Sequence, residues 1–385
     1  MRNYKIATVM GIPINVSISL LVFLPILAWL IGSGAQIVFY AGVINDISTA
    51  SLDPDVLQAG FNPWIIGIIS ALGLFVSVAV HELGHSWVAR RYGLTIESIT
   101  LWIFGGVAKM DVPREWNREF WIAIAGPVTS VVLGAGFYAV LQVLPAVPSL
   151  VFVVGWLAFT NVVLAVFNLL PAFPMDGGRV LRALLARNRP YLQATTVAAT
   201  VGRGFAILMA VAGALTFNVV LLLVALFIYG AAAAESQSVT MTELLKGIEV
   251  GELMTREIVT VRADSTVQEL IDRMLREHHS GYPVTDEGEI VGIVTLADLR
   301  QVREVERDAY TVGDVMSESP VTVPVDTPAI EVLRTIVERD IGRALVERNG
   351  EVVGIVSRSD FVNAMNVRRE TMDTRRRRVV GSNGL

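Results

Sequence analysis

Six long apolar segments alternate with shorter polar stretches over the first 235 residues of the chain. A helix needs about 20 mostly apolar residues to cross a bilayer, and each segment comes near that length. The pattern therefore predicts a multi-pass α-helical membrane protein with about six transmembrane helices. The predicted spans cover residues 14–32, 61–81, 119–144, 150–170, 192–214 and 218–234.

Two other patterns complete the chain. Residues 96–110 are rich in β-branched and aromatic residues and contain Gly105-Gly106, which predicts a short β hairpin at the membrane surface. After residue 235 a pattern repeats with a period of about 62 residues, and each copy indicates a strand, a helix, two strands and a helix. This half is predicted to be a soluble α/β pair of modules.

The changes of pattern place the domain boundaries. We expect a transmembrane domain at 1–235, a linker at 236–247, a first module at 248–304, a second module at 308–366 and a basic flexible tail at 367–385. A hydrophobic fraction of 53% and a charged fraction of 17% agree with a chain that is largely embedded in a membrane.

The distribution of charge gives the membrane domain an orientation. Residues 1–242 carry 12 Lys/Arg and 10 Asp/Glu, whereas residues 243–385 carry 19 and 26. The connections at 33–60, 145–149 and 215–217 contain no Lys or Arg, and connections rich in these residues stay in the cytoplasm. We therefore expect both termini and the paired modules in the cytoplasm, with the spans in the plasma membrane.

Composition limits the chemistry. The chain has no Cys, which excludes disulfides, thiol catalysis and zinc sites built on sulfur. His81 and His85 are four residues apart on a predicted helix and so share one face, with Glu82 beside them. A structural His–Glu pair is the alternative, but such groups are costly to keep at a membrane boundary without a task. A metal site is the favoured interpretation.

A catalytic zinc ion usually takes three protein ligands, so a third is expected. His278 and His279 lie in the soluble half, which leaves carboxylates as candidates. Asp176 follows a long apolar segment in "NLLPAFPMDGGR", where Pro171 and Pro174 prevent a regular helix and let the carboxylate turn inward. The second and fourth spans both run toward the cytoplasm, so they bring the "HELGH" segment and Asp176 to the same depth.

The pairing of "HELGH" with "NLLPAFPMDGGR" resembles the site-2 protease family of intramembrane metalloproteases, and the similarity covers residues 1–235 through "GIPINVS", "FGGVAKM" and "AGP". The resemblance implies one zinc ion per chain held by His81, His85 and Asp176, with Glu82 as the general base. It also implies membrane-spanning protein substrates, which unwind and pair with the strand segment at 96–110. Asn168 is then a candidate for contacting the oxyanion or the substrate backbone, or for capping a helix terminus.

The chain departs from this family in two places. "PINVSIS" carries Val16-Ser17 where many members have a His-containing element, so no role is assigned there. Arg203 lies in the middle of a predicted span, where relatives more often have an uncharged polar residue. A charge at that depth indicates a partner or a watery cavity.

The repeated half resembles a tandem pair of cystathionine-β-synthase-type (CBS) modules, on the strength of "GIVTLAD" and "GIVSRSD". The resemblance implies an adenine nucleotide, AMP or ATP, as a regulatory ligand, with Thr295, Asp298, Ser357 and Asp360 contacting its phosphate and ribose. The alternative is that these residues are only helix caps in a structural dimerisation module. Homo-oligomerisation through the CBS modules is a further expectation.

The sequence thus predicts an intramembrane zinc metalloendopeptidase regulated by nucleotide binding to the CBS pair, which changes access to the active site. Its expected partners are a membrane-embedded protein substrate and the lipid bilayer, and no nucleic acid. Two alternatives remain, a CBS-regulated ion transporter and a catalytically inactive membrane scaffold. Glu82 distinguishes a protease from an ion transporter, because a protease needs this carboxylate and an ion site built on the His and Asp residues does not.

Overall fold

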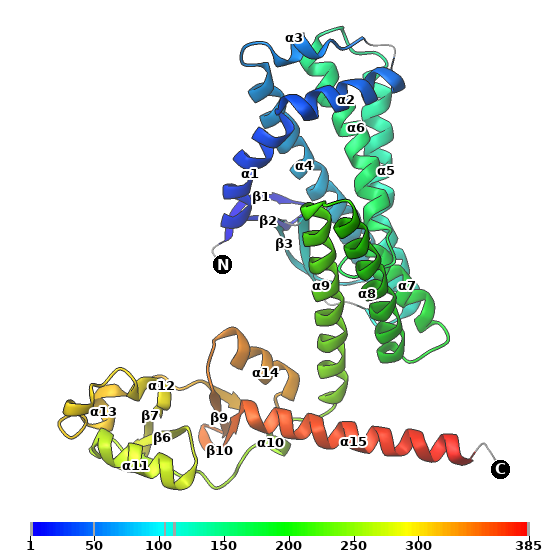
Figure 1. The fold of residues 1–385 in the computed structure, drawn as a ribbon. Helices are drawn as coiled ribbons and strands as arrows, with labels where there is room; N and C mark the ends of the chain where they lie inside the picture. Colours follow the sequence, from blue (N-terminus) through cyan, green and yellow to red (C-terminus); the bar gives the residue numbers. More distant parts are fainter. Residues whose placement is uncertain (1–2, 49–50, 104, 111–112, 383–385) are drawn as a thin grey trace. The chain divides into compact units, whose positions relative to one another are not determined.

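The computed structural model describes residues 3–48, 51–103, 105–110 and 113–382 of the 385-residue chain, with side chains up to residue 371. The chain folds into two compact units, Met1–Gln237 and Ser238–Leu385 (Figure 1). The first unit holds the apolar helices and a small β-sheet, and the second holds the repeated α/β modules.

Helices dominate the first unit. They are α1 (Ile18–Ile31), α2 (Gly34–Ile47), α3 (Pro54–Gln58), α4 (Asn62–Arg91), α5 (Trp116–Leu141), α6 (Pro148–Asn168), α7 (Asp176–Ala186), α8 (Tyr191–Leu215) and α9 (Val219–Leu244). In the described part of the chain, five of them, α4, α5, α6, α8 and α9, are long and apolar enough to cross a membrane. These five confirm the last five predicted spans.

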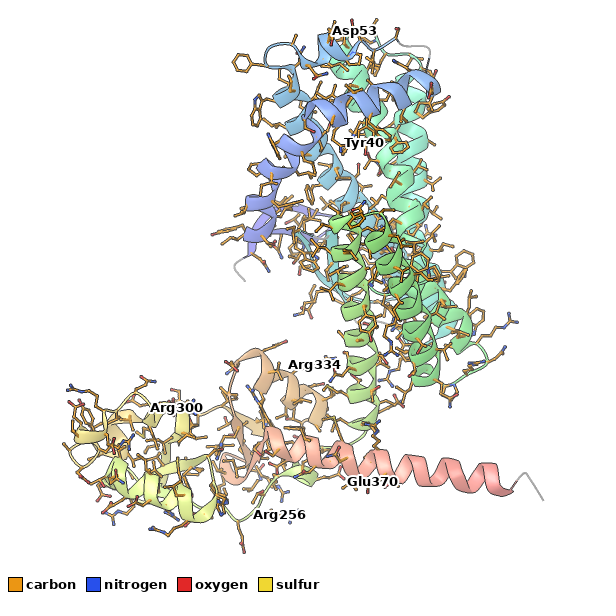
Figure 2. The ribbon with its side chains drawn as sticks, in the orientation of Figure 1. Tyr40, Asp53, Arg256, Arg300, Arg334 and Glu370 are labelled. Atoms are coloured by element: carbon orange, nitrogen blue, oxygen red, sulfur yellow. The ribbon has the colours of Figure 1, made fainter. Side chains whose placement is uncertain are left out.

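The first predicted span, residues 14–32, is not one continuous helix. Residues 14–17 belong to a strand, and α1 has 14 residues, a length of about 21 Å against the roughly 30 Å of a bilayer core. The chain continues after Gly32 into α2, which is bent by 67° relative to α1, and only the pair together satisfies the length and composition of one span. Helix α2 packs on α6, where Tyr40 contacts Trp156 and Phe159 edge to face (Figure 2).

A four-stranded sheet completes the first unit. Its strands are β1 (Asn3–Val9), β2 (Ile12–Ser17), β3 (Ile96–Trp102) and β4 (Gly105–Met110), in the spatial order β1-β2-β3-β4. The β3–β4 pair is antiparallel and confirms the predicted hairpin, apart from residue 104, which lies outside the described residues. Strands β1 and β2 were not predicted. Strand β2 pairs in parallel with β3, which leaves β4 at an edge of the sheet.

Helix α4 packs against α1, α5 and α6. Small residues on α4 let its backbone come close to these neighbouring helices. A Cβ on Gly67 would lie 2.0 Å from the carbonyl oxygen of Ala28, and one on Gly84 would lie 2.2 Å from Thr129 Oγ1. Such small residues let helix backbones approach in a membrane, where apolar burial alone does not hold helices together. The helix that carries "HELGH" is therefore fixed on several sides.

The second unit contains two modules with one three-stranded sheet each. The first module is built from β5 (Val261–Arg262), α11 (Val267–Glu277), β6 (Gly281–Asp286), β7 (Glu289–Thr295) and α12 (Leu296–Leu299). The second is built from β8 (Thr322–Pro324), α14 (Ala329–Glu338), β9 (Arg343–Arg348), β10 (Glu351–Ser357) and α15 (Arg358–Ser382). Short helices α10 (Val250–Leu253), α13 (Val312–Val315) and the 3-10 turn η1 (Glu304–Glu306) precede or join them. The element order confirms the predicted repeat.

The segments predicted as a linker and as a flexible tail are largely helical in the structure. Helix α9 continues to Leu244 through most of the predicted linker at 236–247, because the chain has no Gly or Pro between Gly230 and Gly247 to end it. Helix α15 occupies residues 367–382 of the predicted flexible tail, where Arg and Glu favour a helix and no breaker stands before Gly381. Residues 383–385 of that tail lie outside the described residues.

Candidate metal centre

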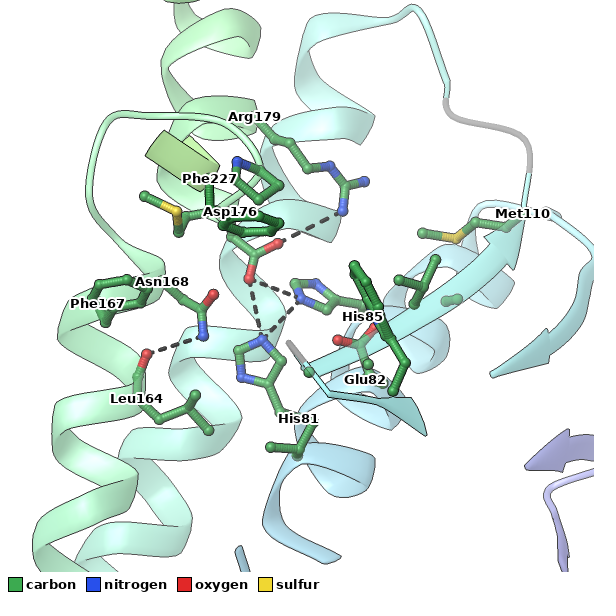
Figure 3. A pocket seen from close by; sticks show the side chains of 18 residues that line it. His81, Glu82, His85, Met110, Leu164, Phe167, Asn168, Asp176, Arg179 and Phe227 are labelled. Carbon is green, nitrogen blue, oxygen red and sulfur yellow. Dashed lines mark hydrogen bonds and ion pairs between the residues drawn. The ribbon is translucent and has the colours of Figure 1, made fainter. Parts of the chain in front are cut away.

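The structure brings His81, His85 and Asp176 together. The two histidines lie one turn apart on α4, and Asp176 is the first residue of α7 (Figure 3). Asp176 Oδ2 is 3.1 Å from His81 Nε2 and 3.1 Å from His85 Nε2, and the two Nε2 atoms are 3.2 Å apart. All three residues are buried.

The loop before Asp176 gives this residue its position. Residues 169–175 form no regular helix between α6 and α7, as the two prolines predict. Asp176 itself opens α7 as its first residue, and its carboxylate turns toward the two histidines. Gly177 and Gly178 allow this start to press against the loop, since a Cβ on either would lie within 2.7 Å of backbone atoms there.

Partners on α5 orient both imidazole rings. His81 Nδ1 is 2.8 Å from Ser130 Oγ, and His85 Nδ1 is 2.6 Å from the carbonyl oxygen of Ile122. Such contacts fix the tautomer and the ring direction of a metal-binding histidine. Both Nε2 atoms are consequently directed at Asp176.

The donor set fits a zinc ion. A carbonyl oxygen only accepts, so His85 Nδ1 carries the proton and Nε2 is the nitrogen left to bind a metal. Nε2 lies 3.1 Å from a carboxylate oxygen of Asp176, and a cation placed between the two atoms would be held by both. Tetrahedral zinc with bonds of about 2.0 Å separates its ligand atoms by about 3.3 Å, close to the three distances observed here.

Gly126 leaves open the space in front of the two histidine Nε2 atoms. A Cβ at this position would lie 2.2 Å from His85 Nε2 and 2.6 Å from His81 Nε2. The sequence analysis named "AGP" only as part of the family resemblance and did not identify Gly126 as part of the site. A glycine has no side-chain chemistry that would mark it as a functional residue.

Replacing Gly126 with alanine is expected to lower the affinity of the cluster for zinc at least about tenfold, the scale seen when support of metal ligands is lost, and so to lower the zinc content of the purified protein. The added methyl group would occupy the space in front of both Nε2 atoms. Zinc per chain, measured by mass spectrometry of the purified protein, tests this. Gly136→Ala on the same helix is the control, because no atom lies within 4 Å of a Cβ there. Normal zinc content in Gly126→Ala would contradict the assignment.

Glu82 lies beside the cluster of His81, His85 and Asp176, in a cavity of about 380 Å³. The cavity is lined by α4, by the loop before α7 and by the edge strand β4. Gly106 of β4 is pressed against the Glu82 side chain, since a Cβ there would lie 2.4 Å from its Cγ. The carboxylate therefore stands between the ligand cluster and an exposed strand edge.

Two further polar side chains line this cavity (Figure 3). Asn168 donates from Nδ2 to the carbonyl oxygen of Leu164 at 3.0 Å, so its amide is held by its own helix while its residue borders the cavity. Arg179 Nη1 is 3.7 Å from Asp176 Oδ1, the carboxylate oxygen that does not face the histidines. The sequence analysis did not identify Arg179. Arg203 is elsewhere, on α8, where it donates to Thr200 Oγ1.

The four predicted nucleotide contacts lie in the second unit, in two separate clefts. Asp298 Oδ2 accepts from the backbone N–H and the hydroxyl of Thr295, at 2.8 and 2.7 Å. Asp360 Oδ2 accepts from the same two groups of Ser357, at 2.7 and 2.8 Å. Both pairs open a helix, α12 and α15, as the cap interpretation predicts, and each also lines a cleft.

Comparisons with known proteins agree with the division of the chain into a unit of apolar helices and a unit of two repeated modules. The model of peptidase family M50 matches residues 69–150 and 145–211, and the model of the CBS domain matches residues 250–304 and 312–367. Zinc metalloprotease MJ0392 of Methanocaldococcus jannaschii is 36% identical over 368 residues, which cover 95% of this chain and 97% of that protein.

Two solved structures are also similar to parts of the chain. The site-2 protease from Methanocaldococcus jannaschii is 36% identical, with 61% of this chain and 95% of that chain covered and a TM-score of 0.43. The CBS domain of a bacterial CNNM/CorC family Mg2+ transporter in complex with ATP is 25% identical, with 34% of this chain and 96% of that chain covered and a TM-score of 0.31.

Proposed function

Because the chain belongs to the site-2 proteases of peptidase family M50, which are zinc metalloproteases, and carries a CBS pair, we propose that it hydrolyses peptide bonds of membrane-spanning protein substrates. The single observation that carries this proposal is the cluster of His81, His85 and Asp176 beside Glu82 in one cavity. The cavity is bordered by helices long enough to cross a bilayer.

The proposed reaction assigns one task to each group. Zinc held by His81, His85 and Asp176 would polarise the scissile carbonyl and make a water molecule more acidic. Glu82 accepts the proton of that water and returns it to the departing amine. Asn168 contributes an amide N–H to the oxyanion or to the substrate backbone once a substrate displaces its bond to Leu164.

The edge strand β4 provides a place for the substrate. A helix hides its backbone groups from a protease, whereas an extended segment can add to an open sheet edge through main-chain hydrogen bonds. Strand β4 is such an edge and lines the cavity with Gly105, Gly106, Val107, Ala108 and Met110. We therefore assign β4 as the strand on which an unwound substrate is held.

The proposed orientation places the site near the cytoplasmic face of the plasma membrane. His85 precedes the end of α4 at Arg91 by six residues, or about 9 Å along the helix. Arg90 and Arg91 mark the aqueous border under the positive-inside rule. Water thus has a short path to the ligands, and both termini and the CBS pair lie in the cytoplasm.

Removing the metal is expected to abolish cleavage. The purified full-length protein is incubated with a membrane-spanning test protein, alone, with a zinc chelator, and with chelator followed by excess zinc. Cleavage is expected in the first and third conditions, with a product cut inside the span. Cleavage that survives complete chelation, or none across a panel of substrates, would overturn the proposal and favour an ion transporter or an inactive scaffold.

Regulation is the second part of the proposal. An adenine nucleotide bound to the CBS pair changes the rate of cleavage by favouring one arrangement of the enzyme over another. Support comes from the two clefts of the second unit, each lined by a hydroxyl–carboxylate pair at the start of a helix. A ligand can shift the rate only as far as it binds one arrangement more tightly than the other.

A further inference from the structure

An apolar groove with a volume of about 800 Å³ runs between α4 and α5, and we call it the α4–α5 groove. Val80, Leu83 and Trp87 line it on α4, at the three- and four-residue spacing of one helix face, and Ile124 and Val128 line it on α5. Among the described residues, none lines both this groove and the cavity of the metal cluster. The groove therefore lies on a different face of α4 from the metal cluster.

The polar side chains of the α4–α5 groove gather at one end. Trp87 and Arg91 lie in the last turns of α4, Tyr92 follows that helix, and Trp121 lies in the second turn of α5. Both tryptophan rings are about half exposed, and aromatic residues are enriched at this depth, where a membrane meets water. This end of the groove is therefore the one that opens at the border of the bilayer.

The other end of the groove is apolar. Val80 and Val128 line it, and the hydroxyl of Thr129 is occupied, since Oγ1 donates to the carbonyl oxygen of Ala125 at 2.8 Å. Arg91 follows Val80 by 11 residues, or about 16 Å along α4. This length is close to half of the roughly 30 Å hydrocarbon core. The groove thus has the depth of a single leaflet.

Arg91 gives the open end a positive charge. Its side chain is exposed, and the guanidinium carbon lies 3.9 Å from the centroid of the Trp87 ring. In the part of the chain that the structure describes, no carboxylate pairs with Arg91, and no Asp or Glu lines the groove. A fitting ligand is consequently apolar over about 16 Å and anionic at one end.

A substrate helix fits these features less well than a lipid does. A transmembrane helix needs about 30 Å of apolar surface along its length, roughly twice the length of the groove. A helix placed here would also have α4 between itself and the cluster of His81, His85 and Asp176, because the groove and the metal cavity lie on different faces of α4. A phospholipid matches both the depth and the charge.

We propose that the α4–α5 groove binds one anionic phospholipid, with an acyl chain along the two helices and the phosphate against Arg91. Basic pockets between transmembrane helices bind anionic headgroups in this way. The choice of the cytoplasmic leaflet rests on the proposed orientation of the chain. The lipid class rests on the groove alone, so a test in detergent does not depend on orientation or on cleavage.

The test counts bound lipids on the full-length protein by native mass spectrometry. Phosphatidylglycerol and phosphatidylcholine with identical acyl chains are titrated into the detergent-solubilised wild type, Arg91→Gln and Val128→Trp. We expect one tightly held phosphatidylglycerol per wild-type chain and weaker binding of phosphatidylcholine. Arg91→Gln should lower the affinity for phosphatidylglycerol about fivefold, the contribution of one basic residue at an anionic surface. Val128→Trp should lower it by at least about fivefold, because the larger ring fills the groove.

Two matched controls separate the groove from general effects. Arg189→Gln removes an exposed charge outside the groove, and Val132→Trp adds the same ring at an exposed position of α5 that does not line it. Both should bind phosphatidylglycerol as the wild type does.

Three outcomes would overturn the proposal. Equal affinity for the two lipids would refute the anionic class. A loss in either control as large as that in its partner variant would refute the site. Release of the bound lipid by the membrane-spanning test protein would show that the groove holds substrate.

Discussion

Replacing Glu82 with glutamine is expected to lower the rate of peptide hydrolysis by about a hundred- to ten-thousand-fold, the range that general acid–base catalysis contributes. Glutamine keeps the shape of the side chain and its contact with Gly106 of β4, but it cannot accept a proton at neutral pH. Because Glu82 lies beside the ligand cluster without being part of it, zinc content should stay at one ion per chain.

The measurement pairs cleavage of the membrane-spanning test protein with zinc content of the same preparation. Glu115→Gln is a matched control, since Glu115 precedes α5 with a largely exposed side chain paired to Arg118, outside the cavity. Its activity should equal that of the wild type. Full cleavage by Glu82→Gln would remove the general base from the mechanism, and loss of zinc in that variant would move Glu82 into the ligand set.

The cluster of His81, His85 and Asp176 was predictable because residues of these types are the ones that bind metals. Two histidines four apart share a helix face in any context, and a lone Asp after an apolar segment is costly unless it has a task. The groups that orient the cluster were not predictable in this way. Ser130 and the backbone carbonyl of Ile122 have ordinary roles in most helices, and only the packing of α5 on α4 brings them to the rings.

The strand β2 shows a similar limit for the fold. Ile12, Ile14 and Val16 point inward and are buried, an alternation of period two that indicates a strand. This signal merges with the apolar run of α1 that follows at once, so a search for long apolar segments absorbs it. The pairing of β2 with β3, about 80 residues later, is a long-range contact that no local pattern specifies.

The sequence analysis also did not identify a buried ion network, because long-range packing brings its members together. Arg182 of α7 is 1% exposed and Glu119 of α5 is fully buried. Arg182 Nε donates to Glu119 Oε1 at 2.8 Å, and Nη1 donates to Glu235 of α9. The guanidinium also lies over the rings of Phe173 and Tyr191, 4.9 and 5.0 Å from their centroids. It thus joins α5, α7 and α9 to the loop that leads to Asp176.

Arg182→Met is expected to lower the free energy of unfolding by about 3–5 kcal/mol, because it leaves the Glu119 carboxylate buried without its cation. Equilibrium denaturation in mixed detergent micelles measures the change. Arg189→Met, three residues after the end of the same helix, is the control, since Arg189 is exposed and should shift stability by less than about 0.5 kcal/mol.

The double variant Arg182→Met with Glu119→Leu separates a lost charge pair from lost packing. Replacing both members of a buried ion pair by apolar residues is often neutral, so the second change should recover most of the stability that the first removes. Zinc content should follow the same order, because the network anchors α7, whose first residue is Asp176. A double variant no more stable than Arg182→Met would show that the arginine acts through its contacts with Phe173 and Tyr191, and not through its charge.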